Sequence, residues 1–527
     1  MKILWRKYMK KVLLALFAVV MAAVFGFSGV LAEGIKDDLV IGVAQEINEL
    51  NPMMQNDQIN NNCFALTHER LVFLDNGHGY EIYPEIAESW EWTDETHLVF
   101  HLNPNVKFNN GTPLTADDVV FTLNRARSDD PTLSKVSGQL GLVTDVSKID
   151  DYTVQVTTSA YSNELIYNFG SYPLAIQSKA AYEDANNTEP WLVGSGPYIF
   201  KEWQEGQYVT FAKNEDYWNK EARPSYAKEI TFKFLLEASQ RAIALQNGEI
   251  DVCVDPPVTD LRFLEEDENV VVHTQAGTRL FYLGFNVAKE PFTNQKLRQA
   301  VSAAVDKETI IAIVLDDLGK WQTSVLNRGA WSFLDNDQIE GGYTYDVVRA
   351  KSLLEESGYK QGELTVEHFT PTDDPYKTIA PIIQANLKEI GINVDIKSMD
   401  QATLKSECAA GHQQMFLWRW NIGARVDETY RELFYTGFPT NYAQLSDPVV
   451  DDLADKVLTE MDQDKRLQYS YDYQNYMAET VYQVPLYVPD LVIAYNKGLV
   501  VSDSYDDAGV LFAGGGNHFW ARAYVEL

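Results

Sequence analysis

Cysteine is scarce in this sequence. Its 527 residues include three cysteines, Cys63, Cys253 and Cys408, which lie far apart and show no CxxC or similar spacing. That pattern excludes a disulfide-rich scaffold and the common structural zinc motifs. Two states stay open for these thiols: one disulfide in an oxidising compartment, or buried free thiols.

Basic residues are also few relative to acidic ones. The chain has 43 Lys and Arg against 76 Asp and Glu, a formal net charge of −33 at pH 7. Nucleic-acid phosphates need a basic surface, so a nucleic-acid partner is excluded. Such a charge favours solubility outside the cytoplasm but does not define a fold.

Long apolar runs are missing except at the amino terminus. Val12–Ala32 is uncharged and largely apolar, with Val30 and Ala32 at the −3 and −1 positions of a cleavage site before Glu33. We therefore predict a signal peptide at residues 1–32, and its removal would bring the net charge to −33 − 5 = −38, because it holds five basic and no acidic residues. The alternative is an uncleaved anchor, since about 20 apolar residues can span a bilayer. No cysteine follows the run, so we expect no lipid attachment there. The basic residues before the run are Lys2, Arg6, Lys7, Lys10 and Lys11.

Catalytic motifs are absent as well. The sequence contains no GxSxG, no P-loop and no HExxH. His97 and His101 are four residues apart, but the segment between them has the alternation of a strand, which does not place both on one helix face. No general acid–base pair is selected from the many carboxylates. We predict no catalytic residue, no metal site, no cofactor and no enzymatic activity.

A strand followed by a helix is clear at residues 277–311. Phe281, Leu283 and Phe285 alternate with the residues between them, as in a strand. An apolar stripe at helical spacing follows, and Thr293 or Asn294 can cap that helix. Hairpin-like strands precede this segment, whereas helices and strands alternate after it. We therefore place a boundary between two lobes here, since 527 residues exceed one core.

The second half has the pattern of a parallel α/β lobe. A helical stripe of Ile379, Ile383 and Leu387 ends at Gly391 and is followed by an alternating strand at residues 392–396. Strand–helix alternation with short connections favours a largely parallel sheet. A second extended segment, at residues 484–492, is predicted to cross back to the first lobe, giving a two-lobed clamp with a hinge.

An ordered set of short blocks resembles the bacterial extracellular solute-binding proteins, family five, the peptide/nickel-binding class of ABC importers. The resemblance covers about residues 38–495, and its order is more specific than any single block. The first blocks are Pro84, Ala87–Trp90, Leu98–Leu102, Val106–Gly111 and Leu114–Val120. The later ones are Gly194–Tyr198, Asn214–Trp218, Ala244–Asp251, Phe285–Asn286, Pro291–Phe292, Leu297–Ala300, Tyr345–Asp346, Ala350–Leu354 and Gly358–Tyr359.

The resemblance implies an α/β, two-lobed periplasmic-binding-protein-like clamp of the large class, with an extra subdomain in the first lobe. We expect the first lobe to hold residues 33–56, 186–278 and 491–527, the extra subdomain 57–185, and the second lobe 279–490. It further implies an exported monomer at the periplasmic or extracellular face of the cell membrane. That monomer would capture an oligopeptide or other small polar solute for an ABC permease. A secreted hydrolase of glycans or peptides is the alternative.

The strand at residues 414–418 ends in Trp418, Arg419 and Trp420, at the carboxyl edge where open α/β sheets bind ligands. Two indoles and a guanidinium fork there suit a polar organic ligand. Alternatively, one tryptophan is core and Arg419 pairs locally.

Arg425 and Asp427 follow in the next loop. The resemblance implies an aspartate near this loop that binds a peptide's α-ammonium group, but the aligned position is Gly423. Asp427 could replace it from a shifted loop, or act as a surface or helix-cap carboxylate.

Three further residues are candidates for ligand contact. Tyr282 and Asn286 share one face of the strand at 279–286, although Asn286 also suits a bond to backbone near the hinge. Asn51 could line the opposite wall together with residues 55–62, which we expect to form a loop or helix cap outside the core, with a helix beginning near Cys63.

Overall fold

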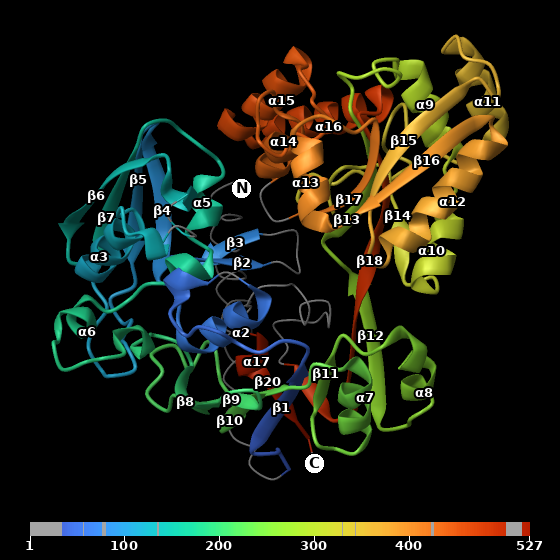
Figure 1. Ribbon diagram of the computed structural model, residues 1–527. Helices are drawn as coiled ribbons and strands as arrows, with labels where there is room; N and C mark the ends of the chain where they lie inside the picture. Colours follow the sequence, from blue (N-terminus) through green and yellow to red (C-terminus); the bar gives the residue numbers. More distant parts are fainter. Residues whose placement is uncertain are drawn as a thin grey trace, which may run out of the picture.

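The computed structural model describes residues 34–55, 57–75, 81–133, 136, 138–328, 330–342, 344–422, 426–501 and 519–526 (Figure 1). The predicted signal peptide at 1–32 lies outside these residues. No helix in the described part of the chain has the length and apolar character needed to cross a membrane.

The first lobe is built on a mixed sheet in the order β11-β1-β10-β9-β8, with β1 parallel to β10 and β11. β8 and β9 form the hairpin that precedes β10. The elements of this lobe are β1 (Asp38–Val43), β8 (Tyr198–Gln204), β9 (Tyr208–Lys213), β10 (Glu229–Phe234), α7 (Ala238–Gln246), β11 (Val252–Val254), α8 (Leu261–Glu265), β12 (Val270–Ala276), β19 (Leu499–Val501), α17 (Phe519–Arg522) and β20 (Ala523–Val525). Three elements fall within the range predicted for the extra subdomain: α2 (Gln58–Thr67), which packs against the core of the first lobe, and β2 (Val72–Asp75) and β3 (Glu81–Pro84), which pack against the core of the subdomain.

The extra subdomain is a four-stranded antiparallel sheet in the order β4-β5-β7-β6, covered by α3. Thr115 and Asp118 form a capping box at the start of α3, which satisfies backbone N–H groups that the first helical turn leaves free. The elements here are β4 (Ala87–Asp94), β5 (His97–Leu102), α3 (Ala116–Ala126), β6 (Val143–Asp150), β7 (Thr153–Thr158), α5 (Leu165–Asn168) and α6 (Lys179–Glu183).

The second lobe is an α/β unit in which β16, β15 and β17 run parallel and β13 pairs antiparallel with β17. Ile379, Ile383 and Leu387 of α12 are fully buried against this sheet, as their spacing predicts. The elements are β13 (Arg279–Phe285), α9 (Gln295–Ala304), α10 (Lys307–Leu315), β14 (Gly319–Trp321), α11 (Val347–Glu356), β15 (Leu364–Pro371), α12 (Tyr376–Glu389), β16 (Ile392–Met399), α13 (Gln401–Ala409), β17 (Met415–Asn421), α14 (Val426–Phe434), α15 (Pro448–Thr459) and α16 (Gln463–Thr480).

One long strand, β18 (Gln483–Asn496), belongs to both lobes (Figure 1). Its first half pairs with β13 and β14, and its second half pairs with β12 and β11. The chain passes between the lobes a second time from β12 to β13, through Gly277 and Thr278. A Cβ atom at Gly277 would lie 2.4 Å from the Pro489 carbonyl oxygen of β18, so only glycine fits where the two crossings touch. Both extended crossings that the sequence predicts are present, whereas the residue boundaries of the lobes stay a prediction.

The expectation that residues 55–62 lie outside the core was wrong. Asp57 caps α2, which begins at Gln58 rather than near Cys63, and Asn60 is fully buried within it. The Asn60 side chain donates a hydrogen bond to the Glu49 carbonyl oxygen, so the amide is buried with a partner for its N–H group. Composition alone treats asparagine as a loop residue, but a buried hydrogen bond reverses that preference.

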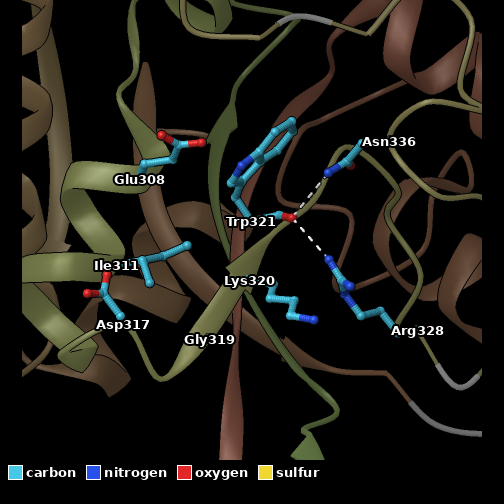
Figure 2. A pocket seen from close by; sticks show the side chains of 8 residues that line it. All are labelled: Glu308, Ile311, Asp317, Gly319, Lys320, Trp321, Arg328 and Asn336. Atoms are coloured by element: carbon cyan, nitrogen blue, oxygen red, sulfur yellow. Dashed lines mark hydrogen bonds between the residues drawn. The ribbon is translucent and has the colours of Figure 1, made fainter.

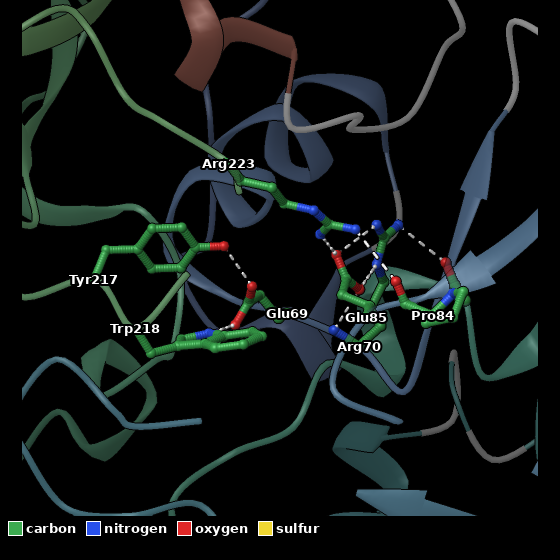
Figure 3. Close-up of polar contacts among 8 residues, drawn as sticks. Glu69, Arg70, Pro84, Glu85, Tyr217, Trp218 and Arg223 are labelled. Atoms are coloured by element: carbon green, nitrogen blue, oxygen red, sulfur yellow. Dashed lines mark hydrogen bonds and ion pairs between the residues drawn. The ribbon is translucent and has the colours of Figure 1, made fainter. Parts of the chain in front are cut away.

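Buried charges connect the first lobe to the extra subdomain (Figure 3). Glu85 accepts hydrogen bonds from the Arg70 backbone at 2.7 Å and from Arg70 Nε at 3.0 Å. Glu69, beside it, accepts from the Tyr217 hydroxyl at 2.7 Å and the Trp218 indole at 2.6 Å. Burial and the charge of Glu85 raise the pKa of Glu69 to about 7. Because breaking a buried pair is costly, this network fixes the orientation of the subdomain on its lobe.

Candidate functional site

The predicted ligand-binding triplet lies at the end of β17, next to the start of β13. Trp418 stands directly opposite Tyr282, Arg419 opposite Phe281, and Asn421 opposite Arg279. β15 pairs with β17 only near Phe416, so the two parallel strands separate before the triplet. The triplet therefore lies where β17 extends beyond its pairing with β15, at the carboxyl edge of the sheet, which the sequence predicts as the ligand edge.

The two tryptophans of the triplet differ in exposure. Trp418 is only 4% exposed and stacks on Tyr376, with ring centroids 6.0 Å apart and an interplanar angle of 15°. The ammonium of Lys405 lies 5.5 Å from the Trp418 ring. Trp420 is half-buried and contacts the neighbouring core from its edge. The interpretation of one tryptophan as core thus fits Trp418, and Trp420 is the one available for contact.

Charged groups surround the triplet. Arg279 Nε donates a hydrogen bond to Asn421 Oδ1 at 3.1 Å, and Arg419 is half-buried. Desolvation lowers the pKa of Arg279, and the nearby Arg419 lowers it further. Asp255 follows β11 of the first lobe and is exposed. Desolvation by the surrounding protein raises its pKa, and the charges of Arg241 and Arg279 act in the opposite direction. Arg279 of the second lobe therefore lies near an acid of the first.

The loop after the triplet supplies a buried acid. Asp427 is in the first turn of α14 and fully buried, with Arg466 Nη2 3.9 Å from its Oδ2 atom. Tyr167 of the extra subdomain is near both groups, because their charges act on its pKa, which burial raises. Asp427 thus interacts with protein groups in the described residues. Arg425 and Gly423 lie outside them.

The remaining candidates have buried side chains. Asn286 donates to the Gly411 carbonyl at 2.9 Å and accepts from the Ala288 backbone at 3.1 Å, the backbone role that the sequence allows. Tyr282 packs in the core on the same face as Trp418, and burial raises its pKa. Asn51 is 3% exposed and accepts from Met53 N at 3.2 Å and Gln177 Nε2 at 3.1 Å.

Sequence reasoning did not select Arg279, Tyr376 or Asp255. Arg279 is at the first position of the predicted crossing strand, and its place beside the triplet follows only once β13 and β17 are known to be antiparallel neighbours. Tyr376 sits at the start of α12, next to Asp373 and Asp374, which follow β15 and are exposed. The strand-end rule would have found this segment, because it follows a parallel strand directly.

A separate cavity of about 380 Å³ lies beside the crossing strand β18 (Figure 2). It is lined by side chains from α10, β14 and the loop after β14, and the Trp321 carbonyl oxygen accepts from Asn336 at 3.3 Å and Arg328 at 3.4 Å. Glu308 and Asp317 oppose Lys320 and Arg328 there, so the lining favours neither sign of ligand charge. No predicted site residue lines it.

The extra subdomain touches the second lobe directly. Asn163 donates from its backbone to the Leu458 carbonyl at 3.0 Å and from Nδ2 to the Glu460 carbonyl at 2.6 Å. The Tyr161 hydroxyl donates to Asn163 Oδ1 at 2.7 Å and orients the amide. These bonds join the end of α15 to the subdomain across the two halves of the molecule.

Cysteine and metal chemistry add nothing to this site. Cys63, Cys253 and Cys408 are buried free thiols. The described residues contain no group of three or more His, Cys, Asp or Glu side chains that could hold a metal ion.

A family model, that of the bacterial extracellular solute-binding proteins, family 5 (middle), matches residues 81–442, more than half of the chain. The chain belongs to family 5 of these solute-binding proteins. This family 5 protein is 28% identical over 464 residues to Di/tripeptide-binding protein 3 of Pseudomonas aeruginosa, covering 82% of this chain and 85% of that protein. It is 29% identical over 383 residues to Heme-binding protein A of Haemophilus influenzae, covering 67% and 68% of the two chains. The structure of HbpA2 from Haemophilus parasuis matches it with a TM-score of 0.81 at 25% identity, covering 93% of this chain and 100% of that one.

The family membership confirms the predicted fold class and function. The family 5 protein is a two-lobed α/β clamp and a substrate-binding component of the ABC-transporter type, not an enzyme. The comparisons support this function and give no support to the secreted hydrolase.

Proposed function

We propose that this protein captures a peptide-like or other polar organic solute between its lobes and delivers it to an ABC permease. The observation that carries the proposal is the family match over residues 81–442 on a chain whose lobes are joined by β18 and by the β12–β13 passage. A hinge of this kind lets two rigid halves close on a ligand and exclude water, which strengthens polar contacts. One relative is named for di/tripeptides and another for heme, which supports a small peptide or another organic solute as the ligand.

The ligand is held at the carboxyl edge of the second-lobe sheet. Trp420 and Arg419 contact it, Trp418 packs beneath Trp420, and Asp427, buried in the first turn of α14, supports this edge from within the fold. Arg425, outside the described residues, stays a predicted ligand contact. Tyr282, Asn286 and Asn51, whose side chains are buried or bonded to protein, shape the walls rather than touch solute. The support for this assignment is the separation of β15 from β17 and the exposure of Trp420 there.

The protein acts as an exported monomer at the periplasmic or extracellular face of the membrane. Its partners are the membrane permease subunits, and ATP hydrolysis belongs to other chains of the importer. The lobe boundaries at residues 56, 185, 278 and 490 are part of the same proposal. The switch of β18 partners at Pro489 and Asp490 supports the last of these.

Two measurements test the proposal. Native mass spectrometry of the protein purified without denaturation should show a retained solute, and calorimetry with that solute should give a saturable isotherm without turnover. Trp420→Ala should weaken binding by about 1–4 kcal/mol. Trp203→Ala, in β8 at the far edge of the first-lobe sheet, is the matched control and should bind normally. Steady release of a reaction product would overturn the proposal.

A further inference from the structure

Two arginines from neighbouring strands share one face of the second-lobe sheet. Arg279 stands opposite Asn421, and Phe281 stands opposite Arg419. Directly opposed residues of an antiparallel pair share a face, and so do residues two apart on one strand. Arg279 and Arg419 are therefore diagonal neighbours, close enough for one ligand group to reach both.

Neither guanidinium has a carboxylate as ion-pair partner within the described residues; the hydrogen bond from Arg279 goes to the neutral amide of Asn421. The charge of Arg419 lowers the pKa of Arg279, so the two like charges repel each other, and a bound anion would relieve that repulsion. Acidic residues exceed basic ones by 33 in this chain, so carboxylates are common, yet none forms an ion pair with these two arginines in the described residues. The unneutralised pair is therefore a candidate for external neutralisation.

Within the described residues, the acids near this pair form no ion pair with it. Asp255 influences the pKa of Arg279 from the first lobe, but the described residues contain no ion pair between Asp255 and either arginine. Arg241, also near Asp255, donates to backbone carbonyl oxygens. Its Nη2 atom lies 2.6 Å from the carbonyl oxygen of Asp255, and its Nε atom lies 2.8 Å from that of Val254. Asp373, whose charge also acts on the pKa of Tyr376, accepts a hydrogen bond from Gln401 at 2.8 Å and forms no ion pair with either arginine in the described residues.

Two tyrosine hydroxyls on the same side are also unsatisfied. Tyr376 and Tyr487 are fully buried, and their hydroxyl groups have no hydrogen-bond partner among the residues that the structure describes. Both rings contact Phe281, at centroid distances of 5.6 and 4.9 Å. Burial raises the pKa of Tyr376 to about 12, and the charges of Arg419, Asp373 and Arg279 act on it as well, so that hydroxyl is near the arginine pair. A buried hydroxyl without a partner costs free energy that a ligand oxygen can recover.

We propose that Arg279 and Arg419 together bind a carboxylate group of the solute, with the Tyr376 hydroxyl as a further donor. The inference rests on the proposed solute-binding function and narrows its ligand class to solutes that present a carboxylate at this edge. Guanidinium forks match the planar geometry of a carboxylate, and such charge-assisted hydrogen bonds are stronger than neutral ones. The carboxylate can come from a peptide's carboxyl terminus or from an acidic side chain, and the probes below separate these sources.

Four tripeptides serve as calorimetric probes: Ala-Glu-Ala, Ala-Gln-Ala and the carboxyl-terminal amide of each. A probe that carries the required carboxylate should bind about 10- to 100-fold more tightly than the one lacking both acids, as expected for one charged hydrogen-bonded contact. If the terminus is read, both amides lose affinity; if the side chain is read, both glutamine peptides do. Equal affinity for all four peptides would overturn the inference.

The variants locate the contact. Arg279→Gln and Arg419→Gln should each reduce the acid-to-amide preference, and the double variant should abolish it. Arg262→Gln is the matched control, since that side chain is 85% exposed on α8 and pairs with Glu266; it should keep the full preference. A preference that survives in the double variant would place the carboxylate elsewhere and overturn the proposal. Circular dichroism spectra matching the wild type exclude misfolding as the cause.

The same probes separate a failure of the proposed solute-binding function from a failure of the carboxylate contact. If none of the four peptides binds, the peptide-like form of the proposed function fails. The arginine pair is then decided by succinate as a peptide-free probe. Succinate binding that is lost in the double variant supports the carboxylate contact, and no succinate binding to the wild type overturns it.

Discussion

At the scale of single residues, exposure decides which tryptophan does what. Trp418 and Trp420 are indistinguishable in the sequence pattern, since both precede the same loop. The register places Trp418 opposite Tyr282 with its ring against Tyr376, while Trp420 stays half-buried. One indole therefore contributes mainly packing energy, and the other remains available to a ligand.

Trp418→Ala should lower the free energy of unfolding by about 3–5 kcal/mol, because it leaves a cavity beside Tyr376. It should also weaken solute binding, since Trp420 and Arg419 lose their support. Trp420→Ala should affect binding while lowering stability by less. Urea titrations compared with calorimetry measure the two effects; unchanged affinity in both variants, with intact folding, would refute the placement of the site.

A buried histidine sets part of the acid sensitivity. His368 of β15 is fully buried, and neither ring nitrogen has a hydrogen-bond partner in the described part of the chain. Desolvation lowers its pKa from 6.5 to about 3. Below pH 6.5 the unfolded chain binds a proton at this position that the folded chain does not, so stability falls as pH falls. Stability at neutral pH is unaffected by this linkage.

His368→Leu should therefore recover about 3 kcal/mol of the stability that the wild type loses between pH 7 and pH 4. Urea unfolding at both pH values checks this. His101→Leu, on the exposed side of β5, is the control and should leave the loss unchanged. An identical loss in the wild type and the His368 variant would show that this ring is protonated in the folded state.

At the scale of elements, the apolar periodicity of the sequence predicts helices and strands of the second lobe, whereas contacts between elements do not follow from it. The strand and helix patterns of the second lobe correspond to β13, α9, α11, α12, β16 and β17, because each apolar stripe faces the same core. Asn60 escaped prediction since its burial depends on a hydrogen bond to Glu49, which no local pattern reveals. Arg279 escaped for a similar reason, since strand order decides its neighbours. A sequence pattern specifies which side of an element is apolar, but not which polar groups meet across two elements.

The contact between the end of α15 and the extra subdomain should hold the lobes together. Asn163→Ala removes the side-chain bond to Glu460 and the acceptor for the Tyr161 hydroxyl. We expect faster solute dissociation, by about 3- to 10-fold, because one or two hydrogen bonds of the lobe-to-lobe contact are lost. Stopped-flow fluorescence measures this. Asn105→Ala, exposed in the same subdomain, is the control; equal dissociation rates in all three proteins would exclude a role for the contact.

At the scale of the whole molecule, the account depends on two lobes that move about two strand crossings. β18 continues from one lobe to the other without interruption, and β12 leads into β13 through Gly277 and Thr278. A hinge of a few residues between two packed halves absorbs the change in backbone angles, which favours closure as a rigid-body motion of the halves. Solute binding and closure should therefore be linked. A solute that binds the closed form more tightly than the open form shifts the population toward the closed form.

Small-angle X-ray scattering with and without the co-purified solute tests this linkage most directly. The solute-free protein should have the larger radius of gyration, and adding solute at saturating concentration should reduce it to the value computed for the two lobes in contact through Asn163 and Glu460. A scattering profile that does not change while calorimetry reports saturable binding would contradict closure of the clamp on its ligand.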